Sequence, residues 1–186
     1  MEIEKYNWRE VKVKGMVKRA KLINDVVELI PIFHLLSTET YRKVYNALLE
    51  GWYTVGELTE MFGEGYEEAL KILKNAGMLE VKWRMPSDPG GKPEKEYHVS
   101  YTHVSANFYI SLKDLNKVLE VVFMTDDEIE EYVKKIEDEI RSGRTSVPYI
   151  TKDLNLDPLF LRAIAKRSLK LNLKGQLIEI AKNEEI

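Results

Sequence analysis

The chain has 186 residues, of which 44% are hydrophobic and 32% charged, so it can bury one sizeable core or two small ones. It contains no cysteine, which excludes disulfides and thiolate metal sites, and no apolar run approaches the roughly 20 residues that span a bilayer. The net charge of -3 does not by itself indicate a nucleic-acid-binding protein, but the charges lie in blocks of alternating sign along the chain.

Residues 1–36 are interpreted as an N-terminal arm and a helix. The first residues lack the basic-then-apolar order of a signal peptide, so we expect a cytoplasmic protein without a membrane segment. Val11, Val13 and Val17 alternate with charged residues, which is the period of a half-buried strand. Residues 22–30 are predicted to form a helix that ends at Pro31.

Residues 37–110 carry the pattern of a winged helix-turn-helix domain. A first helix is predicted from Ser37 or Thr38 to Gly51. Thr54 and Glu57 then form a capping box, which marks the start of a second helix.

The third helix of this domain is predicted from its turn, its buried face and its end. Gly63 and Gly65 supply the tight turn before it. Leu70, Leu73 and Ala76 recur at three-residue spacing and predict one buried face. Gly77 lies where a left-handed helix C-cap is expected, so this helix ends there.

Two segments rich in β-branched and aromatic residues follow and predict the two strands of a wing, LEVKWRM and the long EYHVSYTHVSANFYIS. Between them lies a loop rich in Pro and Gly. The basic residues of this wing are candidate DNA contacts in a minor groove. They are Lys82, Arg84, Lys92 and Lys95. The alternative is an ordinary solvated hairpin.

Residues 111–186 are predicted to form a helical C-terminal domain. Ser111 caps a first helix, whose apolar face is predicted to comprise Leu112, Leu115, Val118, Leu119 and Val122. A capping box of Thr125 and Glu128 opens a strongly acidic helix, which Gly143 ends.

A second helix-turn-helix-like unit is predicted after Gly143. It comprises a short helix at 149–154, a turn, and a helix at 159–169 with Pro158 in its first turn. Lys174 and Gly175 are predicted as the turn of a small terminal hairpin. The fold class is therefore α+β, mainly α with a small β wing.

The C-terminal region also carries a candidate second basic surface, predicted on the exposed side of helix 159–169. Its residues are Arg162, Lys166, Arg167 and Lys170. They are interpreted either as a second DNA contact or as partners for the acidic helix 126–139. The sequence leaves both open.

The segment LKILKNAGMLE, together with TVGEL and the Pro/Gly wing, resembles archaeal ArsR-like winged helix-turn-helix transcription regulators over residues 35–110. The resemblance implies a homodimer that binds double-stranded promoter or operator DNA, with recognition helices in successive major grooves. Longer archaeal members include regulators of archaellum (motility) operons of the EarA type. Apolar segments outside the winged-helix core are candidates for dimer packing: Trp8, residues 22–30 and residues 112–122.

On this resemblance the helix after Gly65 is the recognition helix. Its candidate DNA contacts are Tyr66, Glu67, Lys71 and Lys74. Adjacent glutamates at 67 and 68 depart from the Ser, Thr, Gln or Arg usual in DNA-reading helices, because carboxylates near phosphates are unfavourable. This departure supports an alternative function, a protein-binding adaptor of the basal transcription machinery.

Catalysis and metal binding are not expected from the sequence. His98 and His103 point to opposite faces of the predicted strand, and His34 lies in an apolar run typical of a core histidine. No nucleophile–base arrangement and no phosphate-binding glycine motif is present. We therefore predict a non-enzymatic protein without a cofactor or metal.

Overall fold

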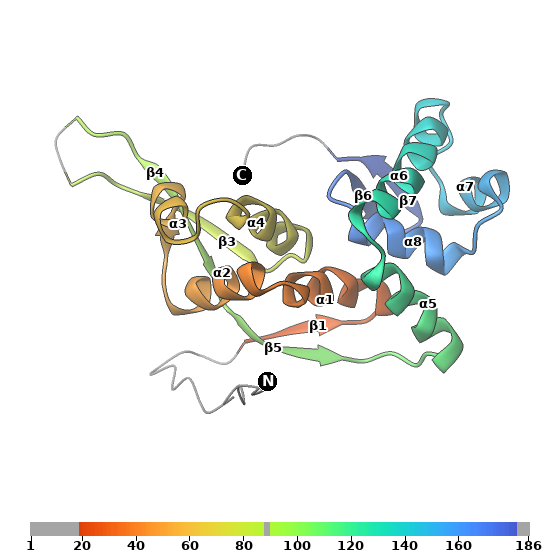
Figure 1. Ribbon diagram of the computed structural model, residues 1–186, viewed down its shortest axis with the longest axis horizontal. Coiled ribbons are helices and arrows are strands. Elements are labelled where there is room, and N and C mark those ends of the chain that lie inside the picture. The colour runs from red at the N-terminus through yellow and green to blue at the C-terminus, as the bar shows by residue number, and fades with distance from the viewer. Residues whose placement is uncertain (1–18, 88–89, 182–186) are drawn as a thin grey trace, which may run out of the picture.

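The computed structural model describes residues 19–87 and 90–181, which form two lobes joined through α1 (Figure 1). The elements in chain order are β1 (Arg19–Ile23), the 3-10 helix η1 (Val26–Leu29), α1 (Ile30–Ser37), α2 (Glu39–Glu50), β2 (Tyr53–Thr54), α3 (Val55–Phe62), α4 (Tyr66–Asn75), β3 (Leu79–Arg84), β4 (Glu94–Val99), β5 (Tyr101–Ala106), α5 (Leu112–Phe123), α6 (Asp126–Arg141), α7 (Val147–Leu154), α8 (Pro158–Arg167), β6 (Leu171–Lys174) and β7 (Leu177–Ile180). No helix of the described residues is both long and apolar enough to cross a membrane. The fold class is α+β, as predicted.

The first lobe has the winged-helix arrangement of α2, α3 and α4 with an antiparallel sheet in the order β2-β4-β3. The predicted capping box is present, because the Thr54 hydroxyl accepts from the Glu57 amide while the Glu57 carboxylate accepts from the Thr54 amide. Gly63 and Gly65 both adopt positive φ angles, 61° and 97°, in the turn between α3 and α4. This backbone conformation strains other residues, so the two glycines make the tight turn possible.

One hydrophobic core holds this lobe together. The predicted buried face of α4 is confirmed, since Leu70, Leu73 and Ala76 are all buried. They pack with Val44 and Leu48 of α2, among others. Each fully buried leucine contributes roughly 1.5–3 kcal/mol relative to an exposed position, so packing rather than helix propensity holds α4 in place.

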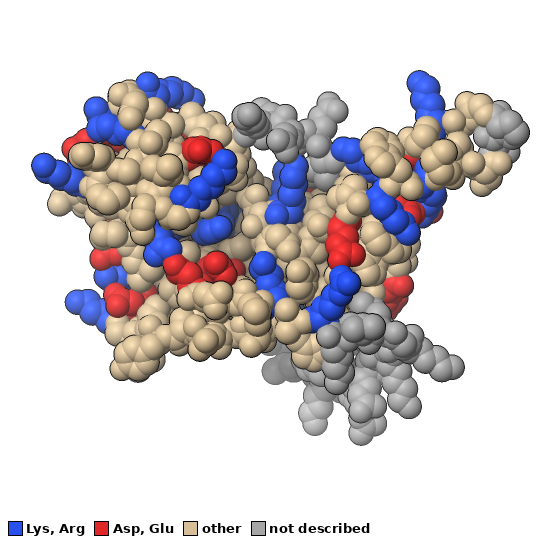
Figure 2. Space-filling model, turned by 180° about the vertical axis from the view of Figure 1, so that it is seen from behind, with Lys and Arg blue, Asp and Glu red and all other residues tan. Residues whose placement is uncertain are grey.

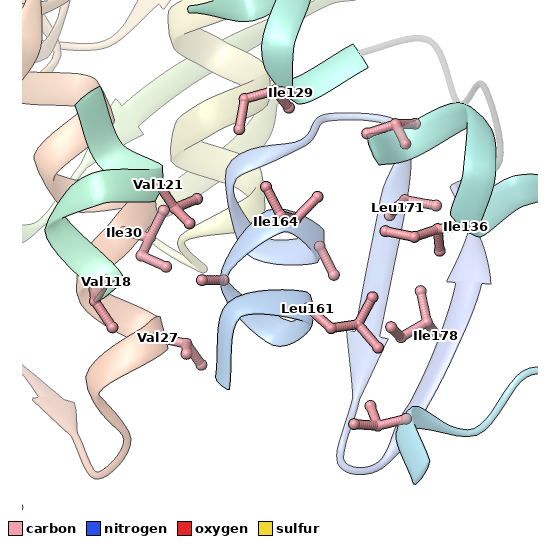
Figure 3. Close-up of a cluster of buried hydrophobic side chains, with 14 of the residues drawn as sticks. Val27, Ile30, Val118, Val121, Ile129, Ile136, Leu161, Ile164, Leu171 and Ile178 are labelled. Carbon is pink, nitrogen blue, oxygen red and sulfur yellow. The ribbon is translucent and has the colours of Figure 1, made fainter. Parts of the chain in front are cut away.

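The second lobe is built around α8 (Figure 3). Val118 and Val121 of α5 lie on one side of α8, and the β6–β7 hairpin and α6 lie on the other side, where Leu161 points toward Ile178. Val27 and Ile30 also belong to this core, while Ile32 and Leu35 belong to the first. The segment 26–37 therefore contributes to both cores and links the two lobes.

The prediction of a helix over residues 22–30 is correct for residues 26–30, which are helical, and wrong at its start. Leu22 and Ile23 end strand β1, and η1 then starts at the Asp25 N-cap. Pro31 lies in the first turn of α1 instead of ending a helix, since a proline there has no backbone N–H to leave unpaired. The predicted alternation at Val11–Val17 falls outside the described residues.

The long strand predicted after the wing loop is in fact two strands that belong to different sheets. β4 pairs with β3 in the wing, whereas β5 leaves that sheet after Ser100 and runs parallel to β1. Composition did not indicate the break, because residues on both sides of it are rich in β-branched and aromatic side chains. The parallel partner lies about eighty residues away in sequence, and only the tertiary fold brings it alongside.

Three details of the C-terminal prediction also need correction. Leu112 is 85% exposed, so it does not belong to the buried face of α5, whereas Val121 does. Lys174 is paired in β6, so the hairpin turn is formed by Gly175 and Gln176. The predicted α6 is present with its capping box, whereas α7 begins two residues earlier than predicted, at Val147, and α8 ends two residues earlier, at Arg167.

Candidate nucleic-acid interface

The exposed face of α4 carries three of its four predicted DNA contacts. Glu67, Lys71 and Lys74 are exposed and lie on one side of the helix at four- and three-residue spacing. Tyr66 is only 6% exposed, and its hydroxyl accepts a hydrogen bond from Thr59 Oγ1 at 3.2 Å. The prediction of Tyr66 as a DNA contact does not fit this burial, because the ring is part of the core.

Glu68 differs in role from its neighbour Glu67. The Tyr41 hydroxyl donates to Glu68 Oε2 at 2.5 Å, which ties the first turn of α4 to α2. Burial, and then this hydrogen bond, raise the pKa of Tyr41 well above its usual range. Of the two adjacent glutamates, Glu67 is the exposed one, and its carboxylate accepts only a long hydrogen bond from the Tyr66 hydroxyl at 3.5 Å among the described residues. It joins Glu64 and Lys71 along a groove of about 620 Å³ at the α3–α4 turn.

The wing is fastened to α3 by Arg84. Its guanidinium donates to Glu57 at 2.7 Å, to Glu96 at 2.5 Å and to the carbonyl oxygen of Trp52 at 3.0 Å. The hydrogen bond from Arg84 holds the pKa of Glu57 below its usual range. Arg84 therefore holds the wing against the helix-turn-helix, and its charge is compensated within the protein.

The other predicted wing cations divide into two kinds. Lys82 pairs with Glu96 at 2.9 Å, and its ammonium lies 4.0 Å from the ring centroid of Trp52. The hydrogen bond from Lys82, and after it that from Arg84, lower the pKa of Glu96. Lys92 and Lys95 have no ion pair among the described residues. Their charges are thus available to a ligand.

The predicted second basic surface is mostly engaged inside the protein. Arg167 is buried and donates to Asp126 at 2.8 Å, so its placement on the exposed side of the helix was wrong. Lys170 pairs with Glu130 at 2.6 Å, and Arg162 pairs with Asp25. Two of these partners belong to the acidic helix α6, which was the alternative interpretation of this surface.

Lys166 is the remaining cation of that set. It is half-buried and lines a cleft of about 260 Å³ together with Lys21. Figure 2 shows Lys and Arg on both lobes and around the hollow between them, interspersed with Asp and Glu. The face shown in Figure 2 therefore carries mixed charge and is not uniformly basic.

A set of polar contacts connects the two lobes from α6 to the recognition helix. Arg167 Nη2 donates to Asp126, and Arg167 Nη1 lies 3.1 Å from Nδ1 of the buried His34. The His34 ring meets the ring of Tyr41 edge-on at 5.7 Å, and Tyr41 donates to Glu68. Burial, and then the charge of Arg167, lower the pKa of His34 from 6.5 to about 4. His34 is therefore neutral at pH 7 and accepts from Arg167.

The histidines form no metal site with carboxylates. Among the described residues no group of three or more His, Asp or Glu side chains is placed to hold a metal ion. His98 stacks on Trp52 with the ring centroids 4.9 Å apart, and His103 lies exposed on β5. His34 is a hydrogen-bonded core histidine, as its apolar surroundings predicted.

Sequence reasoning missed two features of this interface. The Glu57–Arg84–Glu96 cluster joins residues up to 39 positions apart, and no local pattern indicates such a contact. The exposed Trp83 was read only as a strand residue. Its signal was present in the alternation of LEVKWRM, where one face carries charges and the other carries apolar residues.

A family model described as the ArsR transcriptional regulator matches residues 23–182. No curated protein matches the chain. The match spans both lobes and includes α4 and the wing, whose geometry is that of a winged helix-turn-helix. The chain belongs to the ArsR family of transcriptional regulators.

Proposed function

We propose that this protein is a non-enzymatic transcription regulator that binds double-stranded promoter DNA as a homodimer. The observation that carries the proposal is that α4 has an exposed face and that the wing beside it carries two lysines, Lys92 and Lys95, without an ion pair among the described residues. In this proposal α4 supplies shape and a few contacts through Glu67, Lys71 and Lys74. Lys92 and Lys95 supply most of the phosphate contacts. Selection of bound fragments from the source genome would identify the sites.

The wing lysines give the first prediction. Replacing Lys92 and Lys95 with glutamine is expected to reduce the slope of log affinity against log salt by about 2, since each phosphate contact contributes roughly one unit. Affinity should fall for all duplexes alike, because phosphate contacts carry no sequence information. Fluorescence anisotropy with a selected duplex over a salt series measures both.

A matched control removes the same charge elsewhere. Lys134 on α6 and Lys152 on α7 are also exposed, and their replacement by glutamine should leave the slope unchanged. If the salt slope of the wing variant is unchanged, the phosphate contacts lie outside the wing. Absence of any binding to promoter fragments at low salt would reject the DNA-binding proposal itself.

The dimer part of the proposal rests on a face of α5. Leu112, Asn116, Leu119 and Phe123 follow one another at spacings of four, three and four, which is the seam of a helix pair. Leu112 is 85% and Phe123 is 78% exposed, while the opposite face of α5 is buried in the core of the second lobe. In an antiparallel pair of α5 helices, Lys113 of each copy would lie near Glu120 of the other. The exposed apolar residues and these opposite charges support the seam as the contact with a second copy.

The second prediction tests this seam. Phe123→Glu is expected to convert the dimer to a monomer, because it places a charge in an apolar interface. Tyr149→Glu on α7 is the control, since Tyr149 is also a largely exposed aromatic side chain. Sedimentation equilibrium of both variants measures the effect. A dimer that persists in Phe123→Glu would assign dimerisation to another surface.

One observation supports a second function, a protein adaptor of the transcription machinery. Glu60, Glu64 and Glu67 are all exposed around the start of α4, where a DNA reader would gain from neutral or basic residues. Such a face suits a basic protein segment. Binding to a basal transcription factor without binding to promoter DNA would favour this function.

Within the family we propose a place among the longer archaeal members, such as the EarA-type archaellum regulators. The proposal is supported by the second lobe, which lies beyond the wing and adds α5 to α8 and a hairpin to the winged helix. We also propose that residues 37–110 act as the DNA-reading unit and residues 111–186 as the dimerisation unit. Fragments recovered from motility promoters would support the first of these proposals.

A further inference from the structure

One face of the wing carries a row of exposed apolar side chains. Val81, Trp83 and Met85 occupy alternate positions of β3 and its continuation, so they project from the same face. Their exposed fractions are 50%, 63% and 72%. Contiguous exposed apolar surface of this kind indicates a contact site. We call these three residues the wing ridge.

The wing ridge continues the buried face of the wing sheet. Val81 lies opposite Tyr97, which is buried in the winged-helix core, whereas Trp83 lies opposite Lys95 farther out. Figure 1 shows β3 and β4 extending past α3 to the tip of the wing. The same face is thus covered by protein near its base and open toward the tip.

The opposite face of the wing is held rigidly by charges. Lys82 and Glu96 pair there, and Arg84 ties the strand to Glu57 of α3. A ridge on a fastened hairpin is already ordered before it meets a ligand, so binding costs little conformational entropy. The anchoring also sets the position of the ridge relative to α4.

The charge of the ridge face selects the kind of ligand. Among the described residues of β3 and β4, Lys95 is the charged residue on the ridge face. The carboxylates of these strands, Glu80, Glu94 and Glu96, lie on the opposite face. Lys92 adds a second unpaired cation in the loop. The ridge is therefore apolar and aromatic and has two cations beside it. Such a surface complements a ligand that has an anionic backbone and flat apolar groups. Duplex DNA has both, in its phosphates and its stacked bases.

We propose that the wing ridge is a wedge that enters the minor groove, partly unstacks one base step and bends the duplex. Trp83 is the residue that stacks on the opened step, and Val81 and Met85 fill the groove beside it. Lys95 and Lys92 contact the flanking phosphates. This inference rests on the proposed DNA-binding function and adds that promoter choice depends on how easily a step deforms.

The test uses the full chain and one selected duplex labelled with a dye at each end, with 2-aminopurine placed at the candidate step. Wild-type protein is expected to shorten the end-to-end distance and to raise 2-aminopurine fluorescence. Trp83→Ala is expected to lose both signals and to bind this duplex about 10–100-fold more weakly, as for loss of one base stack. Trp83→Phe, which keeps a flat ring, should retain part of each.

A mismatch sharpens the test. A single mismatch at the step lowers the cost of unstacking, so it should tighten binding by wild-type protein and leave Trp83→Ala unaffected. Because Trp83 is largely exposed, both variants should keep the wild-type unfolding midpoint, measured by circular dichroism. Both variants should also bind non-specific DNA at low salt as the wild-type protein does, with the same salt slope.

The outcomes separate the wedge from the function on which it rests. Unchanged bending and affinity in Trp83→Ala overturn the wedge and leave DNA binding in place. If bending persists but Trp83→Ala alters the oligomeric state or the capture of a protein partner, the ridge is a protein contact and the wedge is wrong. If wild-type protein binds no duplex at low salt, the proposed function and the wedge both fail.

Discussion

Arg167→Met is expected to lower the free energy of unfolding by about 2–3 kcal/mol. Methionine keeps most of the side-chain volume, so the loss comes from polar contacts more than from a cavity. Without Arg167, the buried Nδ1 of His34 loses its donor and Asp126 loses its cation. Asp126 is 79% exposed and can be rehydrated, which limits the cost. Urea unfolding at pH 7 measures the change.

Lys166→Met is the matched control for Arg167→Met. The two residues are neighbours on α8, but Lys166 is half-buried at the edge of a cleft and forms no ion pair with the described residues. Its replacement should alter the free energy of unfolding by no more than about 0.5 kcal/mol. Equal destabilisation by the two substitutions would show that loss of a cation from α8, rather than the buried hydrogen bonds, is responsible.

Stability should also fall by about 2 kcal/mol between pH 7 and pH 5 through His34 alone. The pKa of this side chain is lowered from 6.5 to about 4 in the folded protein. Above pH 6.5 it is neutral in both folded and unfolded chains, so its contribution is constant. As the pH falls below 6.5, His34 becomes protonated in the unfolded chain, whereas in the folded chain it stays neutral until about pH 4. The free energy of unfolding therefore decreases through this window.

His34→Gln tests the pH effect, because glutamine can accept from Arg167 but does not titrate. Its unfolding free energy should change by about 2 kcal/mol less than that of the wild type between pH 7 and pH 5. His103→Gln is the control, since His103 is exposed on β5 and should leave the pH profile as it is. A His34→Gln profile that matches the wild type would assign the pH dependence to other groups. Urea titrations at several pH values give the profile.

These two predictions concern the same connection between the lobes. Arg167 and His34 lie where α1 packs against α8 and α2. Tyr41 of α2 contacts the His34 ring and donates a hydrogen bond to Glu68 of α4. Because the side chains contact one another, the effects of Arg167→Met and His34→Gln should not add. Contacts from the second lobe thus help to hold α4 in place.

The winged helix was largely predictable because its signals are local. Thr54 and Glu57 are three residues apart, and their capping box forms within one helical turn of α3. Gly63 and Gly65 mark a turn by their own backbone freedom. Leu70 and Leu73 mark a buried face by their spacing along one helix. Such signals survive in the sequence because they depend on neighbours in the chain.

Which of the candidate DNA contacts are paired inside the protein could be predicted only in part, because charge in a sequence does not reveal its partner. Lys82, Arg84, Lys92 and Lys95 look equivalent as basic residues of one hairpin. In the fold, Lys82 and Arg84 meet Glu96, and Arg84 also meets Glu57, whereas the other two lysines meet no carboxylate among the described residues. Arg167 shows the same effect, since helical periodicity suggested an exposed side that α1 and α6 in fact cover.

The helix caps, the turn glycines and the buried face of α4 could be predicted from local sequence, and the winged-helix fold follows from them, because each depends on residues within one or two turns of each other. Three other features became apparent in the folded protein: residues 22–23 form a strand, β5 pairs with β1, and α8 lies at the centre of a second core. The fold also shows which cations are paired with carboxylates and which have no ion pair among the described residues. Strand partners, desolvation and ion pairs depend on distances in space between residues far apart in the chain, and local sequence patterns do not contain these distances.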